Sequence, residues 1–231
     1  MSIPECGPGD WFSVIRFNVS DPDQTCPTNW QERTTPVRAC ERPMSTTGTS
    51  TCSIGFEESV SRPFTRVAGR AIGYQVGSPD AFFRTFTSRS ADLEGPYVDG
   101  LSITYSTSAN PLNNHIWTFA AGITESNTEL IGCPCVGGRD SSLPAFLQDR
   151  YFCESGVPDG VISSPLLFDD DPLWDGENCE DQCCTGSFAT VPTFCATVEQ
   201  VEGATIRVRI CTDEPTTNEN IAIESLEIFV Q

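Results

Sequence analysis

Lysine is absent from the 231-residue chain, so that every one of its 13 basic residues is an arginine. The absence excludes chemistry that depends on a lysine amine, such as a Schiff base or an amine cross-link. The chain also has 32 acidic residues, which give a formal net charge of −19 at pH 7. Nucleic-acid binding needs a basic face, so nucleic acid is not expected as a partner. Cations, basic proteins, mineral surfaces and neutral glycans fit this charge better.

Histidine and long apolar runs are also scarce. The single histidine, His115, lies far in sequence from every cysteine, and the chain has no Cys-x-x-Cys pair. Both observations argue against a zinc site. No stretch reaches the ~18 apolar residues of a membrane-spanning helix, so no membrane span is expected.

Cysteine, by contrast, is abundant. The chain has twelve, and this even number at high density favours up to six disulfides in a secreted, extracellular protein. Their pairing cannot be derived from the sequence. The cysteines are Cys6, Cys26, Cys40, Cys52, Cys133, Cys135, Cys153, Cys179, Cys183, Cys184, Cys195 and Cys211. The one N-x-S/T sequon, Asn18-Val19-Ser20, points to the same compartment and makes Asn18 a candidate glycosylation site.

Strands are predicted where apolar and polar residues alternate. Asn, Gly and Pro between these stretches are typical of turns. The predicted strands are 11–19, 64–76, 101–105, 115–124, 205–211 and 224–230, with shorter signals at 81–86, 151–153, 188–191 and 194–198. The last long strand is expected to pair with 11–19. The sequence therefore predicts an all-β protein, an antiparallel β-sandwich of jelly-roll type with long disulfide-stapled loops.

The whole chain, 1–231, is interpreted as a single β-sandwich domain. Its predicted centre is the cysteine-free hairpin at 95–124, in which 101–105 is expected to be half-buried and 115–124 to be covered on both faces. The range 21–63 is rich in Pro, Thr and Ser without a sustained apolar period, and 125–202 holds seven cysteines and most acidic clusters. Both ranges are interpreted as irregular, cysteine-rich loop excursions within the domain.

Several phrases of the sequence are long enough to be specific: YVDGLSITY, HIWTFAAG, CPC, YFCESG, PLWDGENC with the following CC, and RVRICTDE with NENIAIESLEIFVQ. They resemble a family of secreted, cysteine-rich proteins of cnidarians and sponges whose members are uncharacterised. The similarity runs from about Cys26 to the C-terminus. It implies an extracellular animal protein and carries over no catalytic or binding residue.

The densest acidic run is a candidate metal site. Asp169, Asp170, Asp171 and Asp175 place several carboxylates on one short segment, as a hard cation such as Ca²⁺ requires. The spacing is not that of an EF-hand. The alternative is a solvated acidic loop tied down by Cys179.

Two tryptophans in polar, cysteine-bounded segments, Trp30 and Trp174, are candidate platforms for stacking on sugar rings. The alternative is that they fill the space beneath a disulfide-tied loop. Trp117 lies in the most apolar predicted strand and is expected in the core.

Catalytic chemistry is weakly indicated. His115 could act as a base on Ser102 or Ser106 with Asp99 orienting it, but no nucleophile elbow accompanies these serines. Arginines on strand faces could pair with acidic patches of other copies or, in the favoured interpretation, within the chain. They are Arg62, Arg66, Arg70, Arg207 and Arg209.

The sequence thus favours a secreted, non-enzymatic structural protein of the extracellular matrix that assembles with copies of itself and associates with cations or mineral. The leading alternative is a calcium-assisted, lectin-like glycan-binding module. A hydrolase is a more distant third.

Overall fold

In a computed structural model, the structure describes residues 6–34, 38–43, 51–77, 100–109, 113–122, 151–155, 193–212 and 219–231. The regular elements of the described ranges are all strands. The strands are β1 (Phe12–Asn18), β2 (Gln31–Arg33), β3 (Ala39–Glu41), β4 (Thr51–Val60), β5 (Phe64–Gly77), β6 (Gly100–Thr107), β7 (Asn114–Gly122), β8 (Tyr151–Ser155), β9 (Thr193–Val201), β10 (Ala204–Thr212) and β11 (Glu219–Val230).

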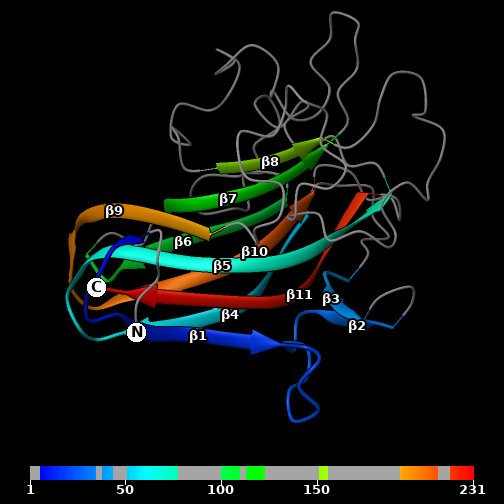
Figure 1. Cartoon of the computed structure of the whole chain (residues 1–231), viewed down its shortest axis with the longest axis horizontal. Coiled ribbons are helices and arrows are strands. Elements are labelled where there is room, and N and C mark those ends of the chain that lie inside the picture. Colours follow the sequence, from blue (N-terminus) through cyan, green and yellow to red (C-terminus); the bar gives the residue numbers. More distant parts are fainter. Residues whose placement is uncertain are drawn as a thin grey trace, which may run out of the picture.

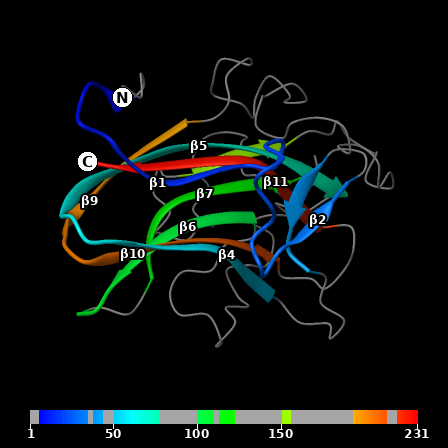
Figure 2. The ribbon, with the colours of Figure 1, turned by 90° about the horizontal axis from the view of Figure 1, so that it is seen from below.

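The strands form two sheets (Figure 1). The six-stranded sheet has the order β2-β3-β11-β5-β9, with β1 also pairing with β11, and the five-stranded sheet has the order β4-β10-β6-β7-β8. Figure 2 shows the sheets stacked, with β1, β5 and β11 above β4, β6 and β10. All described pairs are antiparallel except β7 with β8. The predicted all-β, antiparallel architecture is confirmed.

A two-stranded ribbon passes from one sheet to the other. β4 pairs with β10 in the five-stranded sheet, while their neighbours in sequence, β5 and β9, pair in the six-stranded sheet. The segments that join β4 to β5 and β9 to β10, and so pass from one sheet to the other, are both short. In the turn between β9 and β10, Gly203 takes φ +64°, a conformation that glycine adopts without steric cost. This ribbon is compatible with the jelly-roll type expected from the sequence.

Alternation along the strands builds the core between the sheets. The inward residues of β11 and β10 are buried completely or nearly so, and Trp117 of β7 stacks on Phe194 of β9 with ring centroids 4.7 Å apart. Each such side chain contributes about 1.5–3 kcal/mol relative to exposure. The inward residues of the two strands are Leu226, Ile228, Val230, Ile206, Val208 and Ile210.

The expected pairing of the last long strand with the first is confirmed. β1 pairs with β11 from Phe12–Val230 to Asn18–Ser225. Gly69 packs closely against another strand, because a Cβ there would lie 2.5 Å from the Glu227 carbonyl oxygen and 2.6 Å from the Phe194 ring. The register of β11 shifts between Ile223 and Ser225, opposite Gly73 and Ile72, so β11 has a bulge beside Gly73.

Other expectations need correction. The range 21–63 is not irregular throughout, since it contains β2, β3 and the ten-residue β4. In the range 125–202, by contrast, the shorter strand signals at 151–153 and 194–198 are confirmed as β8 and as the longer β9. The strand at 101–105 is not half-buried, because Ser102 and Thr104 are at most 1% exposed on the face opposite Leu101 and Ile103. The predicted strands at 81–86 and 188–191 lie outside the described residues.

Three disulfides join six of the described cysteines. Cys6–Cys195 ties the segment before β1 to β9, Cys26–Cys40 ties the turn after β1 to β3, and Cys52–Cys211 joins β4 to β10. Sequence separations within the three bonds are 189, 14 and 159 residues, in that order. Cross-links that close loops remove freedom from the unfolded chain. Of the other cysteines, Cys153 belongs to β8 and the rest lie outside the described residues.

Gly69→Ala tests the close approach of β5 and β11. The added methyl would meet backbone and a buried ring, so we expect a loss of about 1–3 kcal/mol in the free energy of unfolding, measured in urea. The control is Gly9→Ala, whose Cβ meets only the rotatable end of the Gln231 side chain and which should cost less. Equal losses in the two variants would contradict the packing described for Gly69.

Removal of single disulfides tests whether each bond stabilises the fold according to the length of the loop that it closes. We expect the Cys6→Ala/Cys195→Ala double variant to lose about 2–5 kcal/mol of unfolding free energy. The Cys26→Ala/Cys40→Ala double variant should lose less, because that bond closes a loop of only 14 residues. Urea unfolding under non-reducing conditions measures both, and the reverse order would refute the explanation by loop length.

Candidate functional site

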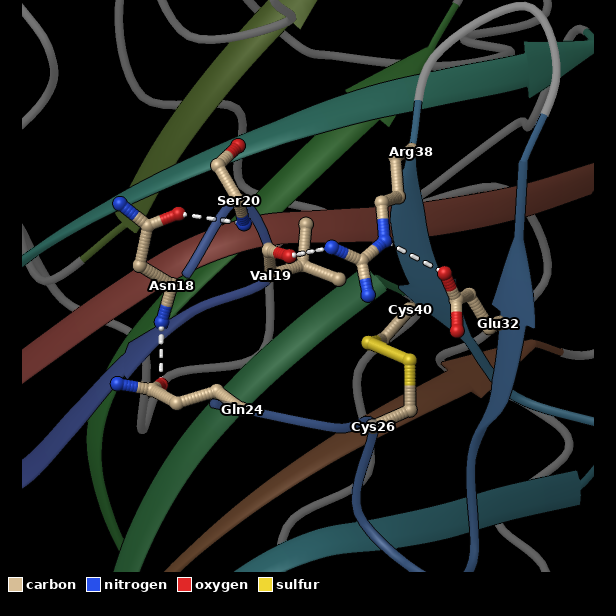
Figure 3. The surroundings of a disulfide bond; sticks show 8 residues. All are labelled: Asn18, Val19, Ser20, Gln24, Cys26, Glu32, Arg38 and Cys40. Carbon is tan, nitrogen blue, oxygen red and sulfur yellow. Dashed lines mark hydrogen bonds and ion pairs between the residues drawn. A yellow bond between two sulfur atoms is a disulfide. The ribbon is translucent and has the colours of Figure 1, made fainter. Parts of the chain in front are cut away.

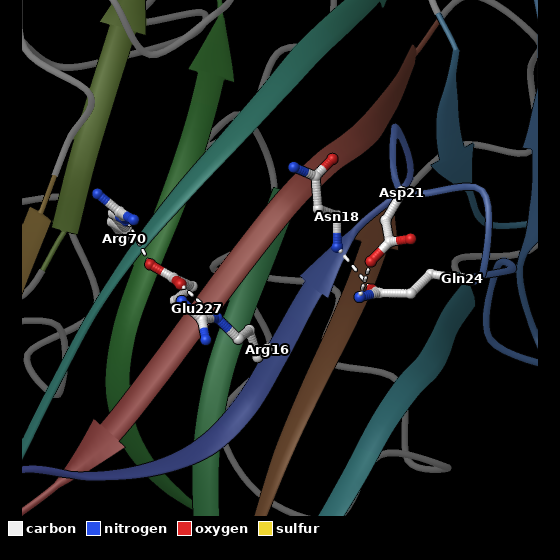
Figure 4. A network of polar contacts seen from close by, with 6 residues as sticks. All are labelled: Arg16, Asn18, Asp21, Gln24, Arg70 and Glu227. Atoms are coloured by element: carbon white, nitrogen blue, oxygen red, sulfur yellow. Dashed lines mark hydrogen bonds and ion pairs between the residues drawn. The ribbon is translucent and has the colours of Figure 1, made fainter.

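A groove lies on the outer side of the six-stranded sheet, where β1, β11 and β5 run next to one another (Figure 4). Its volume is about 570 Å³. We call it the outer-face groove. It is lined by Arg16, Phe17, Asn18, Asp21, Gln24, Arg70, Ile72, Ser225 and Glu227.

Strand register brings the groove residues together. Glu227 of β11 lies opposite Arg16 of β1 and Arg70 of β5, and the next outward position, Ser225, lies opposite Asn18 and Ile72. Successive side chains of a strand point to opposite faces. The residues between these positions therefore enter the core, while the polar ones line the outer face.

One carboxylate links the two arginines of the groove. Glu227 accepts from Arg16 Nε at 3.0 Å and from Arg70 Nε at 2.5 Å. Its side chain is only 12% exposed, whereas those of Arg16 and Arg70 are 67% and 60% exposed. Solvent screens such exposed pairs, so each adds at most about 1 kcal/mol. The guanidinium groups remain open to solvent at the groove's edge.

The turn that follows β1 closes the other end of the groove. The Asn18 backbone N–H donates to Gln24 Oε1 at 2.9 Å, and Gln24 Nε2 donates to Asp21 Oδ2 at 3.1 Å. Asn18 Oδ1 accepts from the Ser20 backbone N–H at 2.8 Å. Such an Asx turn holds the asparagine side chain in one orientation.

The same turn is fixed from behind, as Figure 3 shows. Arg38 donates to the Val19 carbonyl and pairs with Glu32 at 2.5 Å. Beside it, the Cys26–Cys40 disulfide joins the end of the turn to β3. The position of Asn18 is therefore set both by sheet register and by a cross-linked turn.

A second polar cluster covers the outer side of the five-stranded sheet. Cross-strand pairing places Ser102 beside Thr118 and Arg209. Apart from Arg207, its members are at most 9% exposed. We call it the polar face. It consists of Ser102, Thr104, Ser106, Asn113, His115, Thr118, Arg207 and Arg209.

Arg207 is the hub of the described contacts on the polar face. Its Nη1 donates to Ser106 Oγ at 2.5 Å and to Asn113 Oδ1 at 3.0 Å, while its Nε pairs with Glu57 at 2.9 Å. Arg70 likewise pairs with Glu227, so two of the five arginines are paired with carboxylates of the chain, as the favoured interpretation expects. Arg66 donates instead to Gln231, and Arg62 lies over the Phe12 ring.

His115, the candidate base, lies beside a threonine of its own strand. Its Nε2 lies 2.8 Å from Thr118 Oγ1. Ser106 Oγ accepts from Arg207, and Ser102 Oγ has no hydrogen-bond partner in the described part of the chain. Asp99 lies outside the described residues. The described contacts thus join His115 to neither candidate serine.

Trp30 is corrected from a sugar-stacking platform to a packed side chain. It is 5% exposed, its Nε1 donates to the Ser53 carbonyl at 3.2 Å, and its ring meets Phe56 edge-on at 5.4 Å. A Cβ on Gly55 would lie 2.2 Å from the ring, so the ring fills the space that this glycine leaves. The alternative interpretation of a loop tryptophan is the one that Trp30 fits.

The remaining predicted site residues, Asp169, Asp170, Asp171, Asp175 and Trp174, lie outside the described residues. Within the described ranges, no group of three or more His, Cys, Asp or Glu residues is arranged to hold a metal ion. A search of the same ranges finds no helix with the length and apolar character needed to cross a membrane.

Sequence reasoning did not single out the outer-face groove. Its signal was present, because Arg16, Arg70 and Glu227 occupy outward positions of strands that were predicted. The alternation of apolar and polar residues does not predict the strand register, and it is the register that places Glu227 between the two arginines.

Comparison with protein-family models finds none that matches the chain, and comparison with curated proteins finds none that is similar to it. The resemblance to cysteine-rich proteins of cnidarians and sponges therefore stays a prediction.

Substitution of Arg207 tests the polar face. Arg207→Met removes the donor to the buried groups of Ser106 and Asn113, so we expect a loss of about 1–3 kcal/mol in the free energy of unfolding. The matched control is Arg16→Met, in which an exposed ion pair is lost at a cost of at most about 1 kcal/mol. Urea titrations measure the free energy of unfolding of both variants. An Arg207→Met variant as stable as the control would show that these contacts do not stabilise the fold.

Proposed function

We propose that the chain is a secreted, non-enzymatic structural component of the extracellular matrix that assembles with further copies of itself. The observation that carries the proposal is the distribution of its disulfides. One lies in the five-stranded sheet, one secures the turn after β1, and one ties the N-terminal segment to β9. Such cross-links persist in an oxidising compartment, and they suit a protein that must remain folded outside cells.

The distribution of charge supports association through cations. The described residues include most of the 13 arginines but fewer than half of the 32 acidic residues. Arginines of the sandwich are engaged with its own carboxylates, as in the pairs of Arg70 with Glu227 and Arg207 with Glu57. Most of the net charge of −19 therefore belongs to the rest of the sequence, including the predicted cation-binding run at 169–175.

The edges of the sheets carry acidic residues too. In the described strand order, β2 and β9 are the ends of the six-stranded sheet and β4 is an end of the five-stranded sheet. Exposed glutamates lie on all three: Glu32, Glu199 and Glu58. Charges on edge strands oppose pairing between copies. A divalent cation would relieve this repulsion, so we propose that assembly depends on one.

The alternative functions receive less support. The lectin-like hypothesis loses Trp30, which is buried, and now rests on Trp174 and the carboxylates of Asp169–Asp175. A glycan array probed in calcium tests what remains. A hydrolase would need a nucleophile beside His115, and the described contacts join it to Thr118 instead.

Light scattering of the purified chain tests the proposed assembly. At high protein concentration we expect species larger than the monomer in millimolar calcium and their dissociation on addition of EDTA. Raising the salt concentration in EDTA should restore part of the association, because salt screens the repulsion between acidic surfaces. A monomer under all three conditions would rule out self-assembly.

A further inference from the structure

We propose that Asn18 carries an N-linked glycan and that its innermost sugar lies over the outer-face groove. The motif Asn18-Val19-Ser20 is the one N-x-S/T sequon in the chain, and such sequons accept N-linked sugars in secreted proteins. This inference rests on the secretion that the proposed function includes, but not on the proposed assembly, since it concerns a covalent modification of one side chain.

The folded structure leaves the acceptor atom accessible. Asn18 and Ser20 are exposed, while Val19 between them is completely buried. Because Asn18 Oδ1 is held by the Ser20 backbone N–H, the amide group is oriented by its oxygen. Its Nδ2, the atom that would bear the sugar, makes no hydrogen bond to any residue that the structure describes. Figures 3 and 4 show this nitrogen directed away from the turn.

The secretory pathway contains the sugar donor that this modification needs. Disulfides such as Cys6–Cys195 form in the oxidising secretory pathway, where the preassembled donor, an oligosaccharide on a lipid diphosphate, is present. Transfer forms a bond between Asn18 Nδ2 and the anomeric carbon of the first sugar and breaks that carbon's bond to the diphosphate. The lipid diphosphate and one amide proton of Asn18 leave.

The groove fits the first sugar, an N-acetylhexosamine. Ser225 lies beside Asn18 on β11, and Ile72 lies one strand further on β5. Strands are spaced about 4.8 Å apart, so the Ile72 backbone is roughly 10 Å from that of Asn18, within reach of an asparagine side chain and one sugar ring. Ile72 offers an apolar contact for the N-acetyl methyl group. Asp21 and Ser225 offer hydrogen-bonding groups for the hydroxyls.

The flanking arginines are compatible with this placement. Arg16 and Arg70 both pair with Glu227, and the Asp21 carboxylate accepts a hydrogen bond from Gln24. A neutral sugar therefore needs no charged partner there. Once attached, it would cover the outer side of the six-stranded sheet and leave the sheet edges free for contacts between copies.

A pair of substitutions separates the sequon from the turn. Ser20 contributes only its backbone N–H to the turn, so Ser20→Ala abolishes the sequon while the Asx turn is kept. Ser20→Thr preserves both. We expect the chain secreted from animal cells, and the Ser20→Thr variant, to lose the mass of a glycan on treatment with peptide N-glycosidase. The tryptic peptide should then contain Asp at position 18.

The Ser20→Ala variant should have the unmodified mass before and after treatment. A secreted wild-type chain with unmodified Asn18 would overturn the proposal and leave the groove open to solvent. A glycan mass that persists in Ser20→Ala would place the sugar on another residue and overturn the proposal equally.

Nuclear Overhauser effects test where the sugar lies. In the glycosylated chain we expect cross-peaks between the N-acetyl methyl protons of the first sugar and the methyl groups of Ile72, and their loss in Ser20→Ala. A glycosylated chain without such cross-peaks would overturn the placement over the groove. Neither result depends on self-association, because both measurements are made on the monomer in EDTA.

Discussion

The six-stranded sheet depends on the backbone pairing of β11. One edge of this strand pairs with β5 along nearly its whole length, and the other is shared by β3 at Ala222–Ile223 and by β1 from Ser225 to Val230. Because β1 and β3 use the same edge of β11, β1 must end before the stretch that pairs with β3. The last contact on the β1 side is the Val19 N–H, which donates to the Glu224 carbonyl at 2.9 Å. The groove, the Asx turn and the Cys26–Cys40 bond all follow from this shared edge.

The sequence predicted the strands that alternate regularly and missed β2, β3 and the much longer β4. In β4 the register with β10 shifts at Gly55, between Ile54 and Phe56, so a bulge interrupts the two-residue period on which the prediction relied. The same glycine makes room for Trp30, which explains why a tryptophan in a polar segment is buried. Neither fact is visible without the partner strand.

Prediction of the candidate sites was limited in a similar way. Hydroxyl residues alternating with Leu101 and Ile103 are typical of a solvated strand face, and only the structure shows that Ser102 and Thr104 are buried. The sequon at Asn18 could be found by spacing alone. That it adjoins a groove depends on Ser225 and Glu227, which are more than 200 residues away and belong to a strand whose register the sequence does not specify.

The long separation between β1 and β11 also orders events during biosynthesis. Arg16 and Glu227, which face each other in the sheet, are 211 residues apart, and chains are made from the N-terminal end at about 5–20 residues per second. For roughly ten seconds or more after it is made, the segment around Asn18 therefore has no β11 against which to pair. During that interval β1 lacks the partner that it has in the folded sheet, so the proposed transfer of a sugar to Asn18 can precede the pairing of β1 with β11.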